Sequence, residues 1–156
     1  MNKIDLNFNK TLKLTNAIIA EMQEQKFENL DLVIERMENF IKARGFVPIG
    51  PLIQYSSTKL DENGELDIVI KFIRQSSGFI NHTDPPYKCV PILRIKDCMY
   101  VRYTGPESSL KFAYDKINLT AFEEDIKLKG DSYTIFVNQI DDNIVADIFM
   151  ERAKDE

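Results

Sequence analysis

The chain has 156 residues, of which 44% are hydrophobic and 29% charged, with a formal net charge of −5. A chain of this length can bury a core without disulfides or metal ions, so we expect one soluble domain. The negative charge argues against a nucleic-acid-binding surface, which needs clustered Lys and Arg. Residues 1–14 contain no apolar core of signal-peptide length and no stretch has the apolar length of a membrane span, which predicts a cytoplasmic protein without membrane contact.

The first element is ambiguous in isolation. The run "AIIAEMQEQ" consists of good helix formers, and propensity alone would extend a helix back to Asn16. The segment 14–37 nevertheless shares one pattern with the segment 95–117, where "CMYVRY" is typical of a strand and Asp97 matches Asn16. Internal similarity outweighs local propensity, so we predict a strand near residues 12–23 and a duplicated strand–helix–strand–strand unit.

A helix and a hairpin follow in the first unit. The helix is indicated by apolar residues spaced along one face, namely Leu30, Val33, Ile34, Met37 and Ile41. Asn29 is suited to cap its start, and Gly45 follows its end. Two alternating runs, "PLIQYSS" and "ELDIVIKFI", flank Asn63-Gly64, which is a strong hairpin signal.

The connection between the units covers about residues 74–86 and is rich in Ser, Asn and Pro. Phe79 and Ile80 make it too apolar for a free linker, so we expect it to fold over the sheet. The run "KCVPILRI" adds a strand, in which Pro91 favours an edge position or a bulge.

The second unit repeats the order of the first. Its helix is indicated by a stripe formed by Leu110, Ala113, Tyr114, Ile117 and Ala121. Pro106 fits the first turn of this helix, and Gly130 is expected at its end. The runs "SYTIFVNQ" and "NIVADIFM" form the second hairpin, so the units span about 12–73 and 87–150.

Catalytic and metal sites find little support in the residue pattern. Cys89 and Cys98 are not spaced as a CxxC pair and lie among apolar residues, which indicates reduced core thiols. The single histidine, His82, lies in the connection, where exposure to solvent is the simpler expectation. No nucleophile has a motif pairing it with a base, so we predict no catalytic residue, no metal site and no cofactor.

Three stretches resemble the GyrI-like small-molecule-binding domain, also called the bacterial transcription-activator effector-binding domain. They are "GFVPIGPLIQY", "YVRYTGPESSLKFAYDKI" and "VADIFM", and the resemblance runs in order over about residues 12–150. A standalone subset of small proteins of unknown function from Gram-positive bacteria is most similar in length. The family's usual proline after the last strand is replaced here by Glu151, and its upstream helix-turn-helix segment is absent, so we expect no direct nucleic-acid binding.

The resemblance implies an α+β fold in which the duplicated strand–helix–strand–strand units form one curved antiparallel sheet with two helices on one side. It also implies non-enzymatic binding of a small amphipathic, cationic or aromatic ligand in the groove between the units. A few members of the family are hydrolases, which is the enzymatic alternative. The partner expected from the resemblance is therefore a small-molecule ligand.

Strand alternation assigns residues to the two faces of the sheet. The residues expected to face the helices in the second unit are Met99, Val101 and Tyr103. The residues expected on the opposite face are Cys98, Tyr100 and Arg102, matched in the first unit by Ala17, Ile19 and Glu21. Glu21 and Arg102 could offer opposite charges to a ligand or form a solvated bridge.

The ligand-binding residues that we predict are Tyr55, Asp67, Tyr100, Arg102, Asp147 and Phe149. Asp147 is carried over from the family as the acidic contact because it lies in "VADIFM", and the alternative is a solvated residue on the sheet. Aromatic rings could stack on a cationic ligand at about 0.5–2 kcal/mol. The other function left open is that of an adaptor or inhibitor, which would bind a partner protein through the acidic surface or a sheet edge.

Overall fold

The computed structural model describes residues 3–22, 30–83 and 86–153. Within these ranges the chain forms six strands and two α-helices, with a short 3-10 turn before the second helix. In chain order they are β1 (Lys3–Met22), α1 (Leu30–Ala43), β2 (Pro48–Leu60), β3 (Leu66–Ser76), β4 (Tyr87–Pro106), η2 (Glu107–Ser109), α2 (Lys111–Glu123), β5 (Asp131–Ile140) and β6 (Asn143–Glu151).

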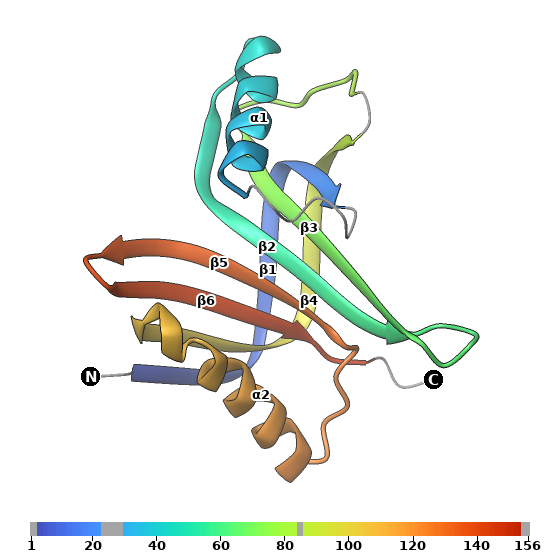
Figure 1. The fold of residues 1–156 in the computed structure, drawn as a ribbon, viewed down its shortest axis with the longest axis vertical. Coiled ribbons are helices and arrows are strands. Elements are labelled where there is room, and N and C mark those ends of the chain that lie inside the picture. The colour runs from blue at the N-terminus through green and yellow to red at the C-terminus, as the bar shows by residue number, and fades with distance from the viewer. Residues whose placement is uncertain (1–2, 23–29, 84–85, 154–156) are drawn as a thin grey trace.

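The strands form one antiparallel sheet in the order β1-β3-β2-β5-β6-β4, and pairing of β1 with β4 closes it. The hairpins β2–β3 and β5–β6 cross the upright parts of β1 and β4 in Figure 1. Each unit contributes a long strand, a helix and a hairpin. The predicted α+β fold, with duplicated units in one curved antiparallel sheet, is confirmed.

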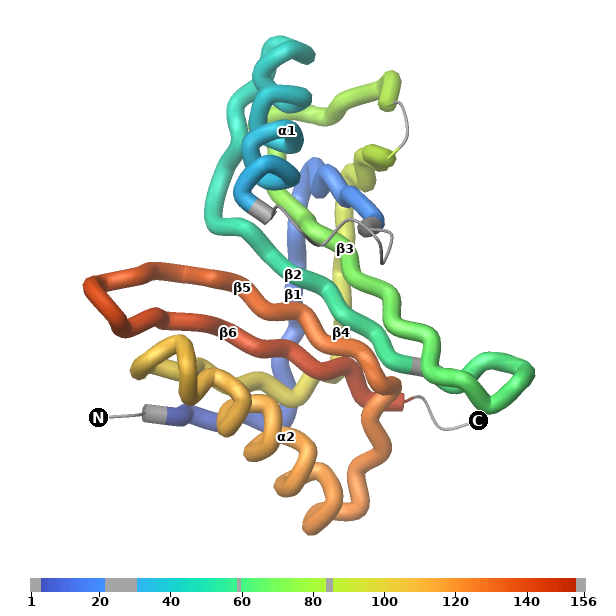
Figure 2. The backbone as a smooth tube through the Cα atoms, viewed as in Figure 1, coloured from blue at the N-terminus to red at the C-terminus, as the bar shows by residue number. Residues whose placement is uncertain are grey.

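The long strands β1 and β4 have 20 residues each and both turn a corner (Figure 2). Asn16 in β1 and Asp97 in β4 have left-handed φ values of 48° and 58°, which Asn and Asp adopt more readily than other non-glycine residues. The irregularity shifts side-chain alternation, so Leu14 and Ala17 belong to the same core cluster. The prediction of a strand over 12–22 is confirmed, with an earlier start, and Gln23 lies outside the described residues.

Both helices pack on the same face of the sheet, which we call the outer face, and lie at opposite ends of the molecule (Figure 1). The contacts of α1 involve Met37 and Ile41 with Ile18, Ala20 and Phe72. The contacts of α2 involve Ala113, Ile117 and Ala121 with Met99, Val101 and Tyr103. The predicted assignment of strand faces is therefore correct for these residues.

The first helix ends as the sequence predicts. The Phe46 amide donates to the Ile41 carbonyl at 3.2 Å and the Gly45 amide to the Lys42 carbonyl at 3.0 Å. Gly45 has a φ of 88°, which completes a Schellman motif. The expected cap residue Asn29 lies outside the described residues.

The second helix ends earlier than the sequence predicts. We expected it to reach Gly130, but α2 ends at Glu123. Asp125 adopts a φ of 55°, and the Ile126 amide donates to the Ala121 carbonyl at 2.8 Å. An aspartate therefore takes the left-handed position that glycine usually occupies, and residues 126–130 lead into β5 instead.

The connection between the units folds against the outer face. Ile80 is buried in the cluster under α1, while Phe79 is largely exposed. The first half of β4 pairs with β1, and β6 joins β4 from Cys98 onward. Pro91 therefore lies in an edge part of its strand, as predicted.

Candidate functional site

The face of the sheet opposite the helices, which we call the inner face, carries a line of aromatic side chains. In register across β2, β5, β6 and β4 these are Tyr55, Tyr133, Phe149 and Tyr100, which we call the aromatic row. Ring centroids are 4.8 Å apart for Tyr55 and Tyr133, and 4.9 Å apart for Tyr100 and Phe149. The two middle rings are buried and the two end rings are partly exposed, so the row is accessible at its ends.

A lysine ammonium lies over the ring at each end of the aromatic row. Lys71 Nζ is 5.5 Å from the ring centroid of Tyr55, and Lys10 Nζ is 5.2 Å from that of Tyr100. Both distances fall within the range in which the negative face of an aromatic ring attracts a cation. The protein's own side chains therefore mark two positions where the inner face favours positive charge.

The Tyr55 end of the row opens into a hollow of about 260 Å³. Its walls come from β1, β2 and β3, and the residues are Glu21, Tyr55, Ser57, Asp67, Val69 and Lys71. Two carboxylates face one ammonium, so the lining carries net negative charge beside an aromatic ring. This hollow lies within the first unit and contains two of the six predicted ligand-binding residues, Tyr55 and Asp67.

The Tyr100 end of the row contains three of the other predicted residues in one hydrogen-bonded group. Asp147 Oδ1 accepts from the Tyr100 hydroxyl at 2.7 Å and from Arg102 Nε at 2.8 Å, and its Oδ2 accepts from Arg102 Nη2 at 2.9 Å. Burial and the Asp147 carboxylate raise the pKa of Tyr100 to about 12, and the same carboxylate raises the pKa of Arg102. Asp147 thus accepts both hydrogen bonds of a two-bond ion pair with Arg102.

The structure corrects two expectations from the sequence, the exposure of Asp147 and the ion-pair partner of Arg102. Asp147 is 9% exposed, so the interpretation of a solvated sheet residue is wrong. Arg102 forms its ion pair with Asp147 and not with Glu21, and Glu21 lies opposite Lys71 in the register of β1 and β3. In the first unit the acidic residue is therefore on the long strand and the basic residue on the hairpin, and in the second unit the two are reversed.

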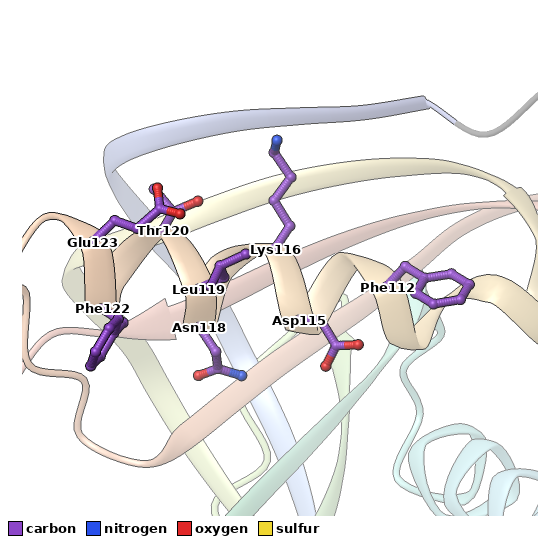
Figure 3. Close-up of a pocket in the computed structure, with 8 residues that line it drawn as sticks. All are labelled: Phe112, Asp115, Lys116, Asn118, Leu119, Thr120, Phe122 and Glu123. Atoms are coloured by element: carbon purple, nitrogen blue, oxygen red, sulfur yellow. The ribbon is translucent and has the colours of Figure 1, made fainter.

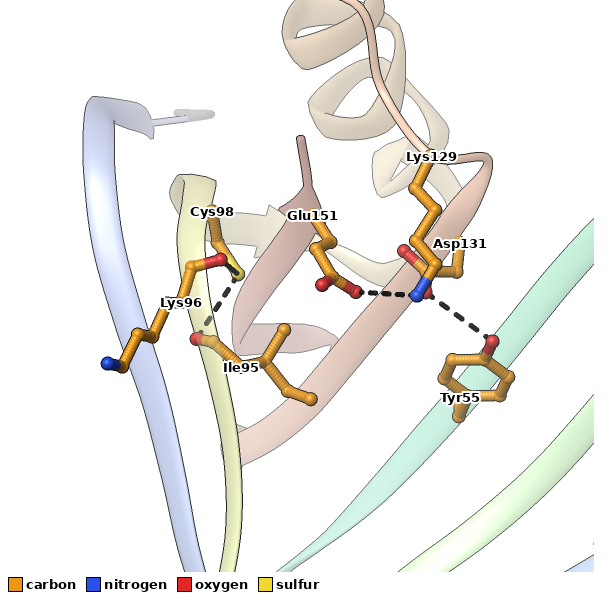
Figure 4. Close-up of polar contacts among 7 residues, drawn as sticks. All are labelled: Tyr55, Ile95, Lys96, Cys98, Lys129, Asp131 and Glu151. Carbon is orange, nitrogen blue, oxygen red and sulfur yellow. Dashed lines mark hydrogen bonds and ion pairs between the residues drawn. The ribbon is translucent and has the colours of Figure 1, made fainter. Parts of the chain in front are cut away.

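Next to Tyr55, at the start of β5, lies a polar group formed by Asp131, Lys129 and Glu151, of which Asp131 is buried (Figure 4). Asp131 Oδ2 accepts a 3.4 Å hydrogen bond from the Tyr55 hydroxyl, and Lys129 Nζ pairs with Glu151 Oε1 at 3.3 Å. Burial raises the pKa of Asp131, and the neighbouring Glu151 carboxylate raises it further. The ammonium of Lys129 acts in the opposite direction.

Cys98 lies opposite Glu151 in the register of β4 and β6 and is unsuited to nucleophilic chemistry. Its thiol is fully buried and directed at the carbonyls of Ile95 and Lys96, at 3.6 and 3.8 Å (Figure 4). Burial, together with the charges of Glu151 and Asp131, raises the pKa of this thiol to about 12. Neither Cys98 nor Cys89 forms a disulfide, as predicted, although Cys89 is only partly buried.

A larger but shallow hollow of about 670 Å³ lies along the exposed side of α2, away from the inner face (Figure 3). Its apolar members, Phe112, Leu119 and Phe122, are 51%, 60% and 81% exposed. Asp115, Lys116 and Glu123 are among the polar residues beside them. Because all of these residues belong to one helix, this surface can serve a docking partner better than it can enclose a small molecule.

The sequence missed three residues of the inner-face site, Tyr133, Asp131 and Glu151. The alternation of "DSYTIFVNQ" places Asp131 and Tyr133 on one face, a signal that was available but that was not connected to Tyr55. Glu151 stands out in the sequence only as a departure from the family pattern. Five of the six predicted residues fall into two groups, and the sixth, Phe149, lies with Tyr133 between those groups.

Within residues 3–22, 30–83 and 86–153, no three His, Cys, Asp or Glu side chains are grouped as they would be to hold a metal ion. His82 is exposed, and its backbone carbonyl accepts a hydrogen bond from Arg44. The helices in this part of the chain are too short or too polar to cross a membrane.

No protein-family model matches this sequence, and neither does any curated protein sequence. Solved structures do match. EcmrR, in a cryo-EM structure of its complex with DNA, aligns with a TM-score of 0.64 and 15% identity over 98% of this chain, which spans 58% of that chain.

Two further solved structures align with this chain over nearly the whole length of both chains. A protein from Listeria innocua described as a hydrolase has a TM-score of 0.56 and 11% identity, with 97% of this chain and 92% of that chain covered. SAV2435 bound to tetraphenylphosphonium has a TM-score of 0.51 and 8% identity, with 93% of each chain covered. At these identities the likeness establishes a shared fold, consistent with the GyrI-like fold that the sequence resembles.

Proposed function

We propose that this chain is a GyrI-like ligand-binding domain that holds a small amphipathic cation on its inner face and catalyses no reaction. The observation that carries the proposal is the aromatic row with a lysine ammonium over the ring at each end. A ligand that combines a positive charge with apolar or aromatic groups offers the same chemistry as these ammonium groups and can stack on the rings as well.

The Tyr55 end of the row is the entry point in this proposal. A hollow of about 260 Å³ is just below the usual range for small-molecule sites, so it suits one or two rings of a cationic ligand whose remainder lies outside the hollow. Glu21 and Asp67 supply negative charge there. Movement of the half-buried Lys71 away from Tyr55 would leave both carboxylates to the ligand.

The other predicted residues have a supporting role in this proposal. Asp147 is already neutralised by Arg102, so a cation would have to displace that guanidinium to reach it. Tyr100, Arg102, Asp147 and Phe149 would then hold the far end of the aromatic row, and ligands long enough to span both units would contact them. The shared fold with SAV2435, which binds tetraphenylphosphonium in its structure, supports this class of ligand.

Binding without catalysis is supported by the state of the nucleophile candidates. The thiol of Cys98 is buried and protonated at neutral pH, and His82 is exposed on the connection between the units. The enzymatic alternative is a hydrolase, the description given to the Listeria innocua protein of this fold. It would require a nucleophile and a base close together on the inner face.

A protein-interaction function is the second candidate, favoured by the exposed apolar side of α2. Pairing of β1 with β4 closes the sheet, but the first half of β4 pairs with β1 alone and keeps an edge. The helix surface of Phe112, Leu119 and Phe122 is the docking site that this second candidate favours, because three large apolar side chains are exposed there together (Figure 3).

Thermal unfolding with tetraphenylphosphonium as the probe tests the proposal. We expect the ligand to raise the unfolding temperature of the wild type and to bind about tenfold more weakly to Tyr55→Leu, because the cation–π contact is lost. The variant Glu123→Gln on α2 removes one negative charge far from the inner face and serves as the control. An equal shift for Tyr55→Leu and wild type, or no shift for any of them, would contradict the proposed site.

A further inference from the structure

Asp131 has a buried carboxylate oxygen that the protein leaves unsatisfied. The residue is 6% exposed, and its Oδ1 has no hydrogen-bond partner among the described residues. Its Oδ2 accepts a 3.4 Å hydrogen bond from the Tyr55 hydroxyl, and a backbone hydrogen bond from Glu151 to the carboxyl acts to lower its pKa. Buried acceptors are rarely left without a donor, so this position points to a group that supplies one.

The charges around this oxygen favour a cation as that group. Asp131 and Glu151 bring two carboxylates together at the ends of β5 and β6, and Lys129 supplies one ammonium. Burial raises the pKa of Asp131 and the Glu151 carboxylate raises it further, while Lys129 acts in the opposite direction. A cation centred between the two carboxylates would stabilise the ionised pair better than Lys129, whose ammonium pairs with Glu151.

Lys129 indicates where such a cation would lie. Its Nζ is 3.3 Å from Glu151 Oε1, and its side chain is 52% exposed while that of Glu151 is 16% exposed. The ammonium thus reaches into the group from outside on a flexible stem (Figure 4). An exposed lysine can move away at small cost, which would open the space in front of both carboxylates.

The group lies directly beside the hollow at the Tyr55 end of the aromatic row. Tyr55 and Ser57 line the hollow, and Ser57 lies opposite Asp131 in the register of β2 and β5. The Tyr55 hydroxyl is also the donor to Asp131. A ligand whose body rests on the Tyr55 ring would therefore have Asp131 within the reach of a short chain.

We propose that the natural ligand is an amphipathic amine whose N–H-bearing ammonium takes the place of Lys129 between Asp131 and Glu151 while its apolar body rests on Tyr55. The inference rests on the proposed function and narrows its ligand class. An alkylammonium or guanidinium can donate to Asp131 Oδ1, whereas a quaternary ammonium or a phosphonium carries the charge without a donor.

Calorimetric titration with 4-phenylbutylamine and its N,N,N-trimethyl analogue tests the inference at neutral pH. The two probes share the charge and the aromatic body and differ in N–H donors. We expect the wild type to bind the primary amine at least about tenfold more tightly, because a hydrogen bond to a charged group is gained. Lys129→Gln should bind the amine more tightly than wild type, since the competing ammonium is absent.

The near-isosteric Asp131→Asn should lose the preference between the two probes while still binding both, and Glu123→Gln should behave as wild type. Equal affinities in the wild type, or a preference that survives in Asp131→Asn, would overturn the amine inference and leave the proposed function intact. Weaker amine binding by Lys129→Gln would overturn the replacement of Lys129. If neither probe binds the wild type, the inference is wrong, and the titration with tetraphenylphosphonium decides the proposed function separately.

Discussion

Arg102 on β4 donates two hydrogen bonds, of 2.8 and 2.9 Å, to the carboxylate of Asp147 on β6, and the Tyr100 hydroxyl donates a third. Removing the arginine would leave a carboxylate with 12% side-chain exposure lacking its countercharge. We expect Arg102→Gln to lower the free energy of unfolding by about 1–2 kcal/mol, since the guanidinium itself is half exposed.

A double-mutant cycle with Asp147→Asn measures this pair. The double variant should be more stable than the sum of the two single changes predicts, with a coupling of about 1 kcal/mol in urea unfolding. Lys116→Gln on α2 is the control for loss of a surface charge. Strict additivity would show that the ion pair contributes nothing to stability.

Asp131 leads to a prediction about pH. Its pKa in the folded protein is raised above the ordinary carboxyl value, so folding favours the protonated form. That contribution is complete below the ordinary pKa and is lost as the pH rises through the raised value. Asp131→Asn has no such proton to lose, and we expect it to be more stable than wild type by on the order of 1 kcal/mol at neutral pH.

The measurement is urea unfolding of wild type and Asp131→Asn across the acid range. The advantage of the variant should shrink as the pH falls and disappear below the ordinary carboxyl pKa. If the variant's advantage in the free energy of unfolding stays constant with pH, ionisation of Asp131 does not destabilise the folded protein.

The two bends of the long strands lie at matching positions of the two units and lead to a prediction about backbone strain. Asn16 and Asp97 hold left-handed backbone conformations at matching positions. Replacement of either by Ala should cost about 1 kcal/mol, because the Cβ of alanine disfavours this region without a compensating side-chain hydrogen bond, whereas Gly should be tolerated. Thermal unfolding of the four variants checks this, and an alanine variant as stable as its glycine counterpart would argue against backbone strain.

The reactivity of the cysteines follows from their burial. With its pKa raised to about 12, the Cys98 thiol should remain unmodified by iodoacetamide at pH 8 in the folded protein. Cys89 is partly exposed and should react first. Mass spectrometry of peptides after a timed reaction locates the label, with urea-unfolded protein as the control in which both sites react. Rapid native labelling of Cys98 would show that the inner face is open to solvent there.

The sequence predicts the fold better than the site. The strand at 12–22 was found because the repeat outweighed the helix propensity of "AIIAEMQEQ", and Met99, Val101 and Tyr103 were placed correctly by alternation alone. The end of α2 was wrong because Asp125 adopts the left-handed position that was assigned to Gly130. Local patterns thus specify elements and faces but not every boundary.

The site depends on pairing between distant strands, which no local pattern encodes. The alternation in β5 places Tyr133 and Asp131 on one face, but only the register of β2 with β5 brings them to Tyr55. Similarly, Arg102 and Asp147 were both named as ligand contacts, and only the register of β4 with β6 shows that they neutralise each other. Charge compensation of this kind requires coordinates.

In the proposed function a small amphipathic cation binds at the Tyr55 end of the inner face. Two-dimensional NMR of the aromatic ring resonances during titration with tetraphenylphosphonium tests it most directly. We expect saturable shifts that are largest for Tyr55 and its neighbour Tyr133, with little change at Phe112 and Phe122 on α2. Shifts confined to Phe112 and Phe122, or no saturable shift at any ring, would contradict it.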